Sequence, residues 1–163
     1  MLWRVCGVVV LAATSVAGRT LGQEQHSHSS ADRLGEVWFP VSCLPEVQKT
    51  FERGVALLHS FAYAAAEKQF AEVSAADPKC AMAHWGVAMS LFHQIWERPE
   101  DSTLKRGPEE MEQAQKIGAK TERERGFISA LAAFYSDPSK DHYQKQATAY
   151  SDAMAKVYQQ NPN

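Results

Sequence analysis

Histidine and cysteine side chains are the residues of this sequence whose spacing could support chemistry. Cys80 stands four residues before His84, so on a helix the thiol and the imidazole would share one face and could hold a metal ion. His84 and His93 are nine residues apart, which is about half a turn out of phase on a helix, so ligands such as His59 would have to come from elsewhere. The spacing favours structural histidines, and we expect no metal ion and no other cofactor.

The motifs of common enzyme classes are missing from the sequence. It contains no glycine-rich phosphate loop, no nucleophile elbow and no His-Glu-x-x-His motif. The carboxylates of Glu67 and Glu72 fall among solvated positions of a predicted helix, and Glu122 and Glu124 belong to a charged first turn. We therefore predict no catalytic residues and no enzymatic activity.

The first residues are typical of an export signal. Arg4 gives a positive start, an apolar run follows over residues 5–18, and small residues suited to cleavage continue to Gly22. The run is short for a membrane-spanning helix, although an uncleaved anchor is the alternative. The sequence thus predicts a signal peptide over residues 1–22, a periplasmic or extracellular location, and no stable membrane insertion of the mature chain.

The composition indicates one globular domain without a nucleic-acid partner. The chain has 163 residues, of which 45% are hydrophobic and 22% charged, with a formal net charge of -2. Its 17 basic and 19 acidic residues are spread along the chain, without the basic stripe that phosphate binding requires. Residues 23–36 are largely polar and predict a flexible lead-in, so the folded domain is expected over residues 37–163.

Cleavage of the signal would remove Cys6 and leave two cysteines, Cys43 and Cys80. Disulfides persist in exported proteins, and the two cysteines lie just before the first and at the start of the third predicted helix. A bridge requires a short distance between their Cα atoms, which a sequence does not supply. A disulfide and two unpaired thiols therefore remain open as alternatives.

Apolar periodicity predicts six helices. The first two are expected over about 45–60 and 63–76, and the third begins near Cys80 and carries its apolar stripe on to Ile95. The charged segment 97–107 lacks a period and predicts a long loop, after which Pro108 would open the fourth helix.

Caps and stops define the remaining helices. Gly118 fits the end of the fourth helix, and Thr121 with Glu124 has the spacing of a capping box for the fifth. Asp141 with Gln144 is predicted to cap the sixth helix in the same way.

The spacing of small and aromatic residues matches a helix–turn–helix repeat of about 34 residues. The matching positions are Gly54, Leu57, Ala66, Phe70 and Pro78. With them the chain resembles the tetratricopeptide repeat family, and the segments FPVSC, FERGVALLHSF and DPKCAMAHWGVAMSL are similar to exported bacterial repeat proteins of unassigned activity. The resemblance covers nearly all of the chain after residue 43.

The resemblance implies an all-α fold, with three antiparallel helical hairpins stacked as a short right-handed solenoid. The chain ends at Asn161-Pro162-Asn163, the turn that leads into the next repeat in this family, so we expect a fragment truncated at its C-terminus. A sixth helix that caps the stack is the alternative.

In this family the first helix of each hairpin lines a concave groove, and the resemblance implies an apolar and aromatic groove that binds a protein or peptide of unknown identity. The expected lining residues are Phe51, Val55, His59, Met82, Trp85, Met89, Phe92, His93, Ile128 and Tyr135. One alternative is that the N-terminal segment or further repeats cover this face. Another is a metal- or haem-associated envelope protein, or an accessory domain of a larger enzyme.

Overall fold

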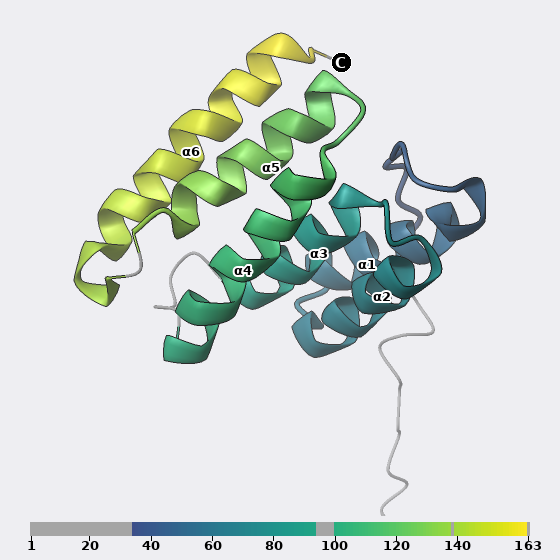
Figure 1. The fold of residues 1–163 in the computed structure, drawn as a ribbon, viewed down its shortest axis with the longest axis horizontal. Helices are drawn as coiled ribbons and strands as arrows, with labels where there is room; N and C mark the ends of the chain where they lie inside the picture. Colours follow the sequence, from purple (N-terminus) through teal and green to yellow (C-terminus); the bar gives the residue numbers. More distant parts are fainter. Residues whose placement is uncertain (1–33, 94–99, 138, 163) are drawn as a thin grey trace, which may run out of the picture.

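The computed structural model describes residues 34–93, 100–137 and 139–162, and this part of the chain is helical without a β-strand (Figure 1). The helices are α1 (Gln48–His59), α2 (Tyr63–Ala76), α3 (Ala81–Phe92), α4 (Asp101–Ile117), α5 (Glu122–Tyr135) and α6 (Tyr143–Gln160), with 3-10 turns at η2 (Pro45–Val47) and η3 (Lys140–His142). The predicted all-α class is confirmed. The predicted signal peptide and most of the lead-in lie outside the described residues.

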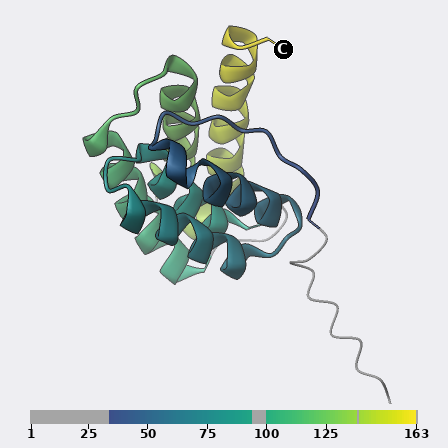
Figure 2. The same cartoon turned by 90° about the vertical axis from the view of Figure 1, so that its right-hand side faces the viewer.

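Each helix packs against its neighbours in the chain. The contacting pairs are α1 with α2, α2 with α3, α3 with α4, α4 with α5 and α5 with α6, and α3 also touches α1 and α5. Residues 34–44 precede η2 and run as a non-helical strap along one side of the bundle (Figure 2). Among the described helices, none combines the length and the apolar character needed to cross a membrane.

The centre of the first three helices is organised around Phe70 of α2, whose side chain is fully buried. Gly54 of α1 and Gly86 of α3 both face this ring: a Cβ atom on Gly86 would lie 2.3 Å from Phe70 Cγ, and one on Gly54 would lie 2.7 Å from Phe70 Cε1. The Phe51 ring packs edge-on against it at 5.2 Å between centroids. Three helices can therefore approach one another closely only because two of them carry glycine at this level.

The fourth helix starts earlier than the sequence predicts. The expected loop over 97–107 is wrong in its described part, because α4 begins at Asp101 and Pro108 lies inside it. Burial of Leu104 supports the early turns. Pro108 removes one helical hydrogen bond and crowds the carbonyl four residues before it, so packing of these turns has to offset that cost. Gly107 supplies a surface without a side chain, onto which the Tyr135 ring packs. The expected continuation of α3 to Ile95 lies outside the described residues.

One predicted helix cap is present and the other is not. The capping box is confirmed: the Glu124 N–H donates to Thr121 Oγ1 at 3.2 Å, and Glu124 Oε2 accepts from the Thr121 N–H at 3.4 Å. The Asp141 cap is wrong, because η3 precedes α6 and the α6 N-cap has no side-chain hydrogen bond. Asp137 orders this turn instead, since its carboxylate accepts from the Ser139 N–H and bonds to the His142 ring. These bonds lower the pKa of Asp137.

Candidate functional site

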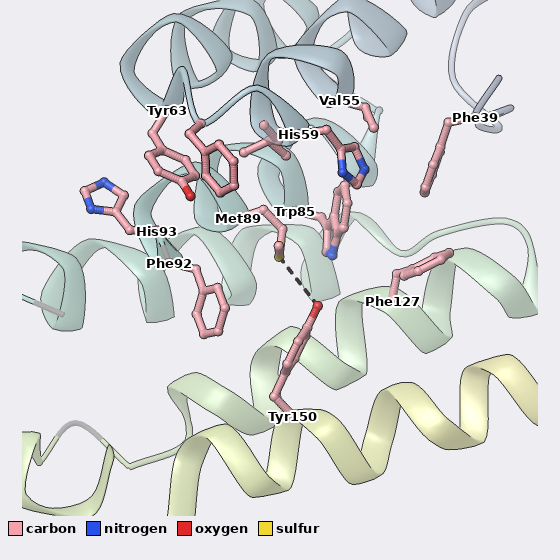
Figure 3. A pocket seen from close by; sticks show the side chains of 12 residues that line it. Phe39, Val55, His59, Tyr63, Trp85, Met89, Phe92, His93, Phe127 and Tyr150 are labelled. Carbon is pink, nitrogen blue, oxygen red and sulfur yellow. Dashed lines mark hydrogen bonds between the residues drawn. The ribbon is translucent and has the colours of Figure 1, made fainter. Parts of the chain in front are cut away.

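An apolar pocket of about 560 Å³ opens at the surface between the strap and five of the helices (Figure 3). Its lining residues are Phe39, Val55, Leu58, His59, Phe61, Tyr63, Trp85, Met89, Phe92, His93, Phe127 and Tyr150. They come from the strap, from α1 and the turn after it, and from α2, α3, α5 and α6. The volume lies in the range of ligand-binding pockets, which are mostly apolar with a few polar groups.

Helix α3 provides the floor of the pocket. Trp85, Met89 and Phe92 follow one another at helical spacing and therefore share one face of α3. The Trp85 ring packs against the rings of Phe39 and Phe127, at 5.9 and 5.7 Å between centroids. The Phe92 ring lies 5.3 Å from that of Tyr150. These ring contacts fix the floor before any ligand arrives, which lowers the entropic cost of binding.

The polar groups of the pocket are few. The Tyr150 hydroxyl donates to the Met89 sulfur at 4.0 Å (Figure 3), and burial raises the pKa of Tyr150, so the hydroxyl stays protonated at neutral pH. The His93 ring stacks on that of Tyr63 with 4.8 Å between centroids. Among the described lining residues there is no Asp, Glu, Lys or Arg, so the polar side chains there are those of His59, His93, Tyr63 and Tyr150.

Strained backbone is concentrated at the rim. Phe61 and His93 are the non-glycine residues of the described chain with positive φ, at 57° and 53°. For side chains of this size the left-handed region costs roughly 1–2 kcal/mol. Phe61 is nevertheless 61% exposed, so burial of its ring does not explain the conformation. Strain of this kind is a signal of function when it is observed at a pocket.

The structure brings six of the ten predicted groove residues together around the pocket: Val55, His59, Trp85, Met89, Phe92 and His93. It places the other four, Phe51, Met82, Ile128 and Tyr135, in the hydrophobic core. The Tyr135 hydroxyl, for example, donates to the Ala88 carbonyl at 2.8 Å, and burial raises its pKa. Leu58, which follows Val55 on the same apolar stripe of α1, also lines the pocket. Sequence reasoning missed the other five lining residues, Phe39, Phe61, Tyr63, Phe127 and Tyr150. Phe61 carried no local signal, because the turn after α1 contains no glycine.

The strap covers part of the predicted groove. The Phe39 N–H donates to Glu52 Oε1 at 3.1 Å, and Gln48 Nε2 donates to the Phe39 carbonyl at 2.8 Å. The Arg123 guanidinium lies 4.6 Å from the centre of the Phe39 ring, on which it makes a cation–π contact. The Phe39 ring is thereby held against Phe51, at 5.7 Å between centroids. The N-terminal segment therefore buries one end of the expected surface and leaves the pocket as the open part.

A disulfide fastens the strap. Cys43 is bonded to Cys80, with 4.9 Å between their Cα atoms, and this bond joins the end of the strap to the start of α3. The Asp77 carboxylate lies beside the bridge and accepts from the Leu44 N–H at 2.8 Å and the Lys79 N–H at 3.1 Å. Two thiolates and a carboxylate could hold a metal ion, but sulfurs joined to each other are not thiolate ligands.

The histidines that could have formed a metal site are separated. His59 and His93 line the pocket, whereas the His84 ring bonds to Glu110 Oε2 at 2.7 Å and to Ser74 Oγ at 3.4 Å. The order serine, histidine, carboxylate is that of a hydrolase triad. Ser74 lies inside α2, however, where backbone N–H groups are engaged in the helix and cannot form an oxyanion hole. These three side chains therefore link α2, α3 and α4.

Comparison of the chain with protein-family models, with curated proteins and with solved structures gives no match. A function for the chain therefore has to be inferred from the geometry of the pocket.

Proposed function

We propose that this chain is an exported, non-catalytic scaffold of tetratricopeptide type that binds a protein or peptide partner through its apolar pocket. The observation that carries the proposal is the pocket itself, which is open, aromatic and lined by residues of α1, α3 and α5. These are the first helices of the three proposed hairpins, and the face they share is the one with which repeat proteins of this type bind partners.

The packing of the helices supports the repeat arrangement. Within each proposed antiparallel hairpin the two helices touch: α1 with α2, α3 with α4, and α5 with α6. The first helices of successive hairpins also touch, since α3 contacts both α1 and α5. A short solenoid of three hairpins would have these contacts, and we propose that arrangement for this chain.

The disulfide supports export. Bridges of this kind persist in oxidising compartments and are rare in the reducing cytosol. The bond between Cys43 and Cys80 holds the strap that forms one wall of the pocket. A periplasmic or extracellular location would keep this wall in place.

The proposal predicts that Phe61→Asn weakens partner binding without weakening the fold. Phe61 is exposed at the rim, and aromatic side chains, phenylalanine among them, are enriched at protein interfaces. Asparagine tolerates positive φ, so the variant should melt at the wild-type temperature or above it. We expect peptides selected from a random library on the oxidised wild-type protein to bind Phe61→Asn about 10-fold more weakly, a change of about 1.4 kcal/mol.

A matched control is Tyr158→Gln, which removes another exposed aromatic side chain at a position on α6 that does not line the pocket. This variant should bind the selected peptides as the wild type does. Equal binding by all three proteins, or a selection that yields no peptide, would contradict the proposal.

A further inference from the structure

We propose that Cys43, Asp77 and Cys80 form a zinc site when the disulfide is reduced, with two thiolates, one carboxylate and a water molecule around the ion. None of these three residues lines the pocket, and the inference does not depend on the proposed function.

The placement of the ligand atoms is the first argument. The two Sγ atoms and one carboxylate oxygen of Asp77 all lie within 4.8 Å of one another. Around a tetrahedral zinc ion with the usual bond lengths, neighbouring sulfur and oxygen ligands are roughly 3.6–3.8 Å apart. Once the bond between the sulfurs is broken, rotation of the two cysteine side chains lets the sulfurs separate toward that distance. The oxidised chain thus already gathers the three side chains that the ion needs.

The carboxylate of Asp77 is the second argument. It belongs to a residue that is only 6% exposed, and buried carboxylates are normally paired with a cation or bound to a metal ion. None of the ion pairs between described residues includes Asp77. Its Oδ2 accepts from the Leu44 N–H at 2.8 Å and its Oδ1 from the Lys79 N–H at 3.1 Å, so each oxygen keeps a second lone pair. These bonds hold the carboxylate as outer-shell hydrogen bonds hold a metal ligand.

The backbone supports the same ligand set. The Cys80 N–H donates to the Asp77 carbonyl at 3.0 Å, so these two ligands belong to one closed turn. Cys80 is also the N-cap residue of α3, where the helix dipole favours a negatively charged thiolate. Cys43 completes the set from the end of the strap. A hollow of about 10 Å³ lies beside Cys43, which is close to the size of one water molecule and provides a place for a fourth ligand.

The ligand types select zinc. Magnesium and calcium ions prefer oxygen ligands, so two thiolates disfavour them. Monovalent copper prefers soft sulfur ligands, so the carboxylate disfavours it. Zinc accepts both sulfur and oxygen, and with three protein ligands it keeps a fourth position for water.

Conversion of the bridge into the site requires a dithiol reductant and a zinc ion. The reductant supplies two electrons and two protons, so the S–S bond breaks, two thiols form on the protein and the reductant becomes a disulfide. Zn²⁺ then takes the place of the two thiol protons, which pass to solvent. The ion would join the end of the strap to the start of α3, as the disulfide does in the oxidised chain.

Competition with a chromophoric zinc chelator tests the site. All proteins are free of tags and carry Cys6→Ser, so that Cys43 and Cys80 are the thiols that remain. After reduction with a phosphine and removal of bound metal, the protein should take up one zinc ion per chain with a dissociation constant below about 1 μM. The oxidised protein should bind zinc at least about 100-fold more weakly, and it measures any zinc that histidines hold elsewhere.

Asp77→Asn distinguishes the three-ligand site from a simple pair of thiols. When reduced, this variant should bind zinc at least about 10-fold more weakly than the wild type, since even outer-shell partners of a metal contribute that much. Asp137→Asn is the matched control, because Asp137 also precedes a proline and accepts from the N–H two residues further on, at 3.1 Å. Asp137 is not part of the cluster, so this variant should bind zinc as the wild type does. Equal affinity of Asp77→Asn and the wild type would overturn the inference.

Cobalt in place of zinc keeps the test decisive if Asp77→Asn does not fold. The reduced wild type should show sulfur-to-cobalt charge-transfer absorption and the visible bands of tetrahedral cobalt, and Cys43→Ser should lose much of the charge-transfer absorption. Octahedral cobalt bands, no zinc uptake by the reduced protein, or equal uptake by the reduced and oxidised proteins would each overturn the inference. The peptide selection on the oxidised protein tests the proposed function separately.

Discussion

Gly86→Ala is expected to lower the free energy of unfolding by about 3 kcal/mol, the upper end of what overpacking of a core costs. The new Cβ atom would lie 2.3 Å from both Cγ and Cδ1 of Phe70. That ring is fully buried and has Gly54 on another side and the Phe51 ring 5.2 Å away, so it has little room to move. Urea denaturation of the purified protein measures the change.

The sign of this effect is informative. In a helix alanine is favoured over glycine by about 1 kcal/mol, so without the clash the substitution would stabilise α3. Gly54→Ala should cost less than Gly86→Ala, because its Cβ would meet the outer edge of the same ring at 2.7 Å. Gly35→Ala is the control, since no atom lies within 4 Å of its added Cβ. A Gly86→Ala protein as stable as the wild type would contradict the packing around Phe70.

The local parts of the fold were predictable from the sequence. The helical spacing of apolar residues and the proline at position 78 predicted the ends of α1 and α2 to within a few residues, because both signals act over one or two helical turns. The capping box at Thr121 and Glu124 was predictable for the same reason, since both bonds lie within one turn. The sequence also indicated why position 54 is glycine: a residue without a side chain lets a neighbouring helix, here α2 with Phe70, approach closely.

What depended on distant contacts was not predictable. By its local pattern Pro108 is typical of the start of a helix, yet α4 begins earlier and continues through it. The Tyr135 ring, 28 positions further along the chain, packs onto the adjacent Gly107. The turn before α6 is a different case, because the competition there is local: Asp141 has the spacing of a cap, but Asp137 takes the hydrogen bonds of that turn, with Ser139 and His142. Spacing alone does not decide between two aspartates in one short segment.

The pocket shows the same division. Helical spacing grouped Trp85, Met89 and Phe92 on one face, and they do form the floor of the pocket. Whether that face is open depends on the strap, which lies across Phe51 and leaves Met89 half-buried. The rim residue Phe61 adopts positive φ without a turn motif in the sequence, so only the folded backbone reveals it.

Loss of the bond between Cys43 and Cys80 is expected to lower the free energy of unfolding by about 4 kcal/mol, the loop-closure value for cysteines 37 residues apart. Replacing both cysteines with serine removes the constraint on the unfolded chain. The strap then depends on hydrogen bonds from the Phe39 N–H to Glu52, from the Val41 N–H to Gln48 and from the Leu44 N–H to Asp77. Urea denaturation of the variant against the oxidised wild type measures the loss.

Reduction of the wild type is the matched control, because it breaks the same bond without changing the side chains around it. The reduced wild type should unfold close to the double serine variant, and the variant should not respond to reductant. Hydrogen exchange at the Phe39 and Val41 amides should accelerate more than at Leu131 in the middle of α5, since the strap carries the first two. A wild type whose stability changes by less than about 1 kcal/mol on reduction would mean that the strap is held by its hydrogen bonds instead of by the disulfide.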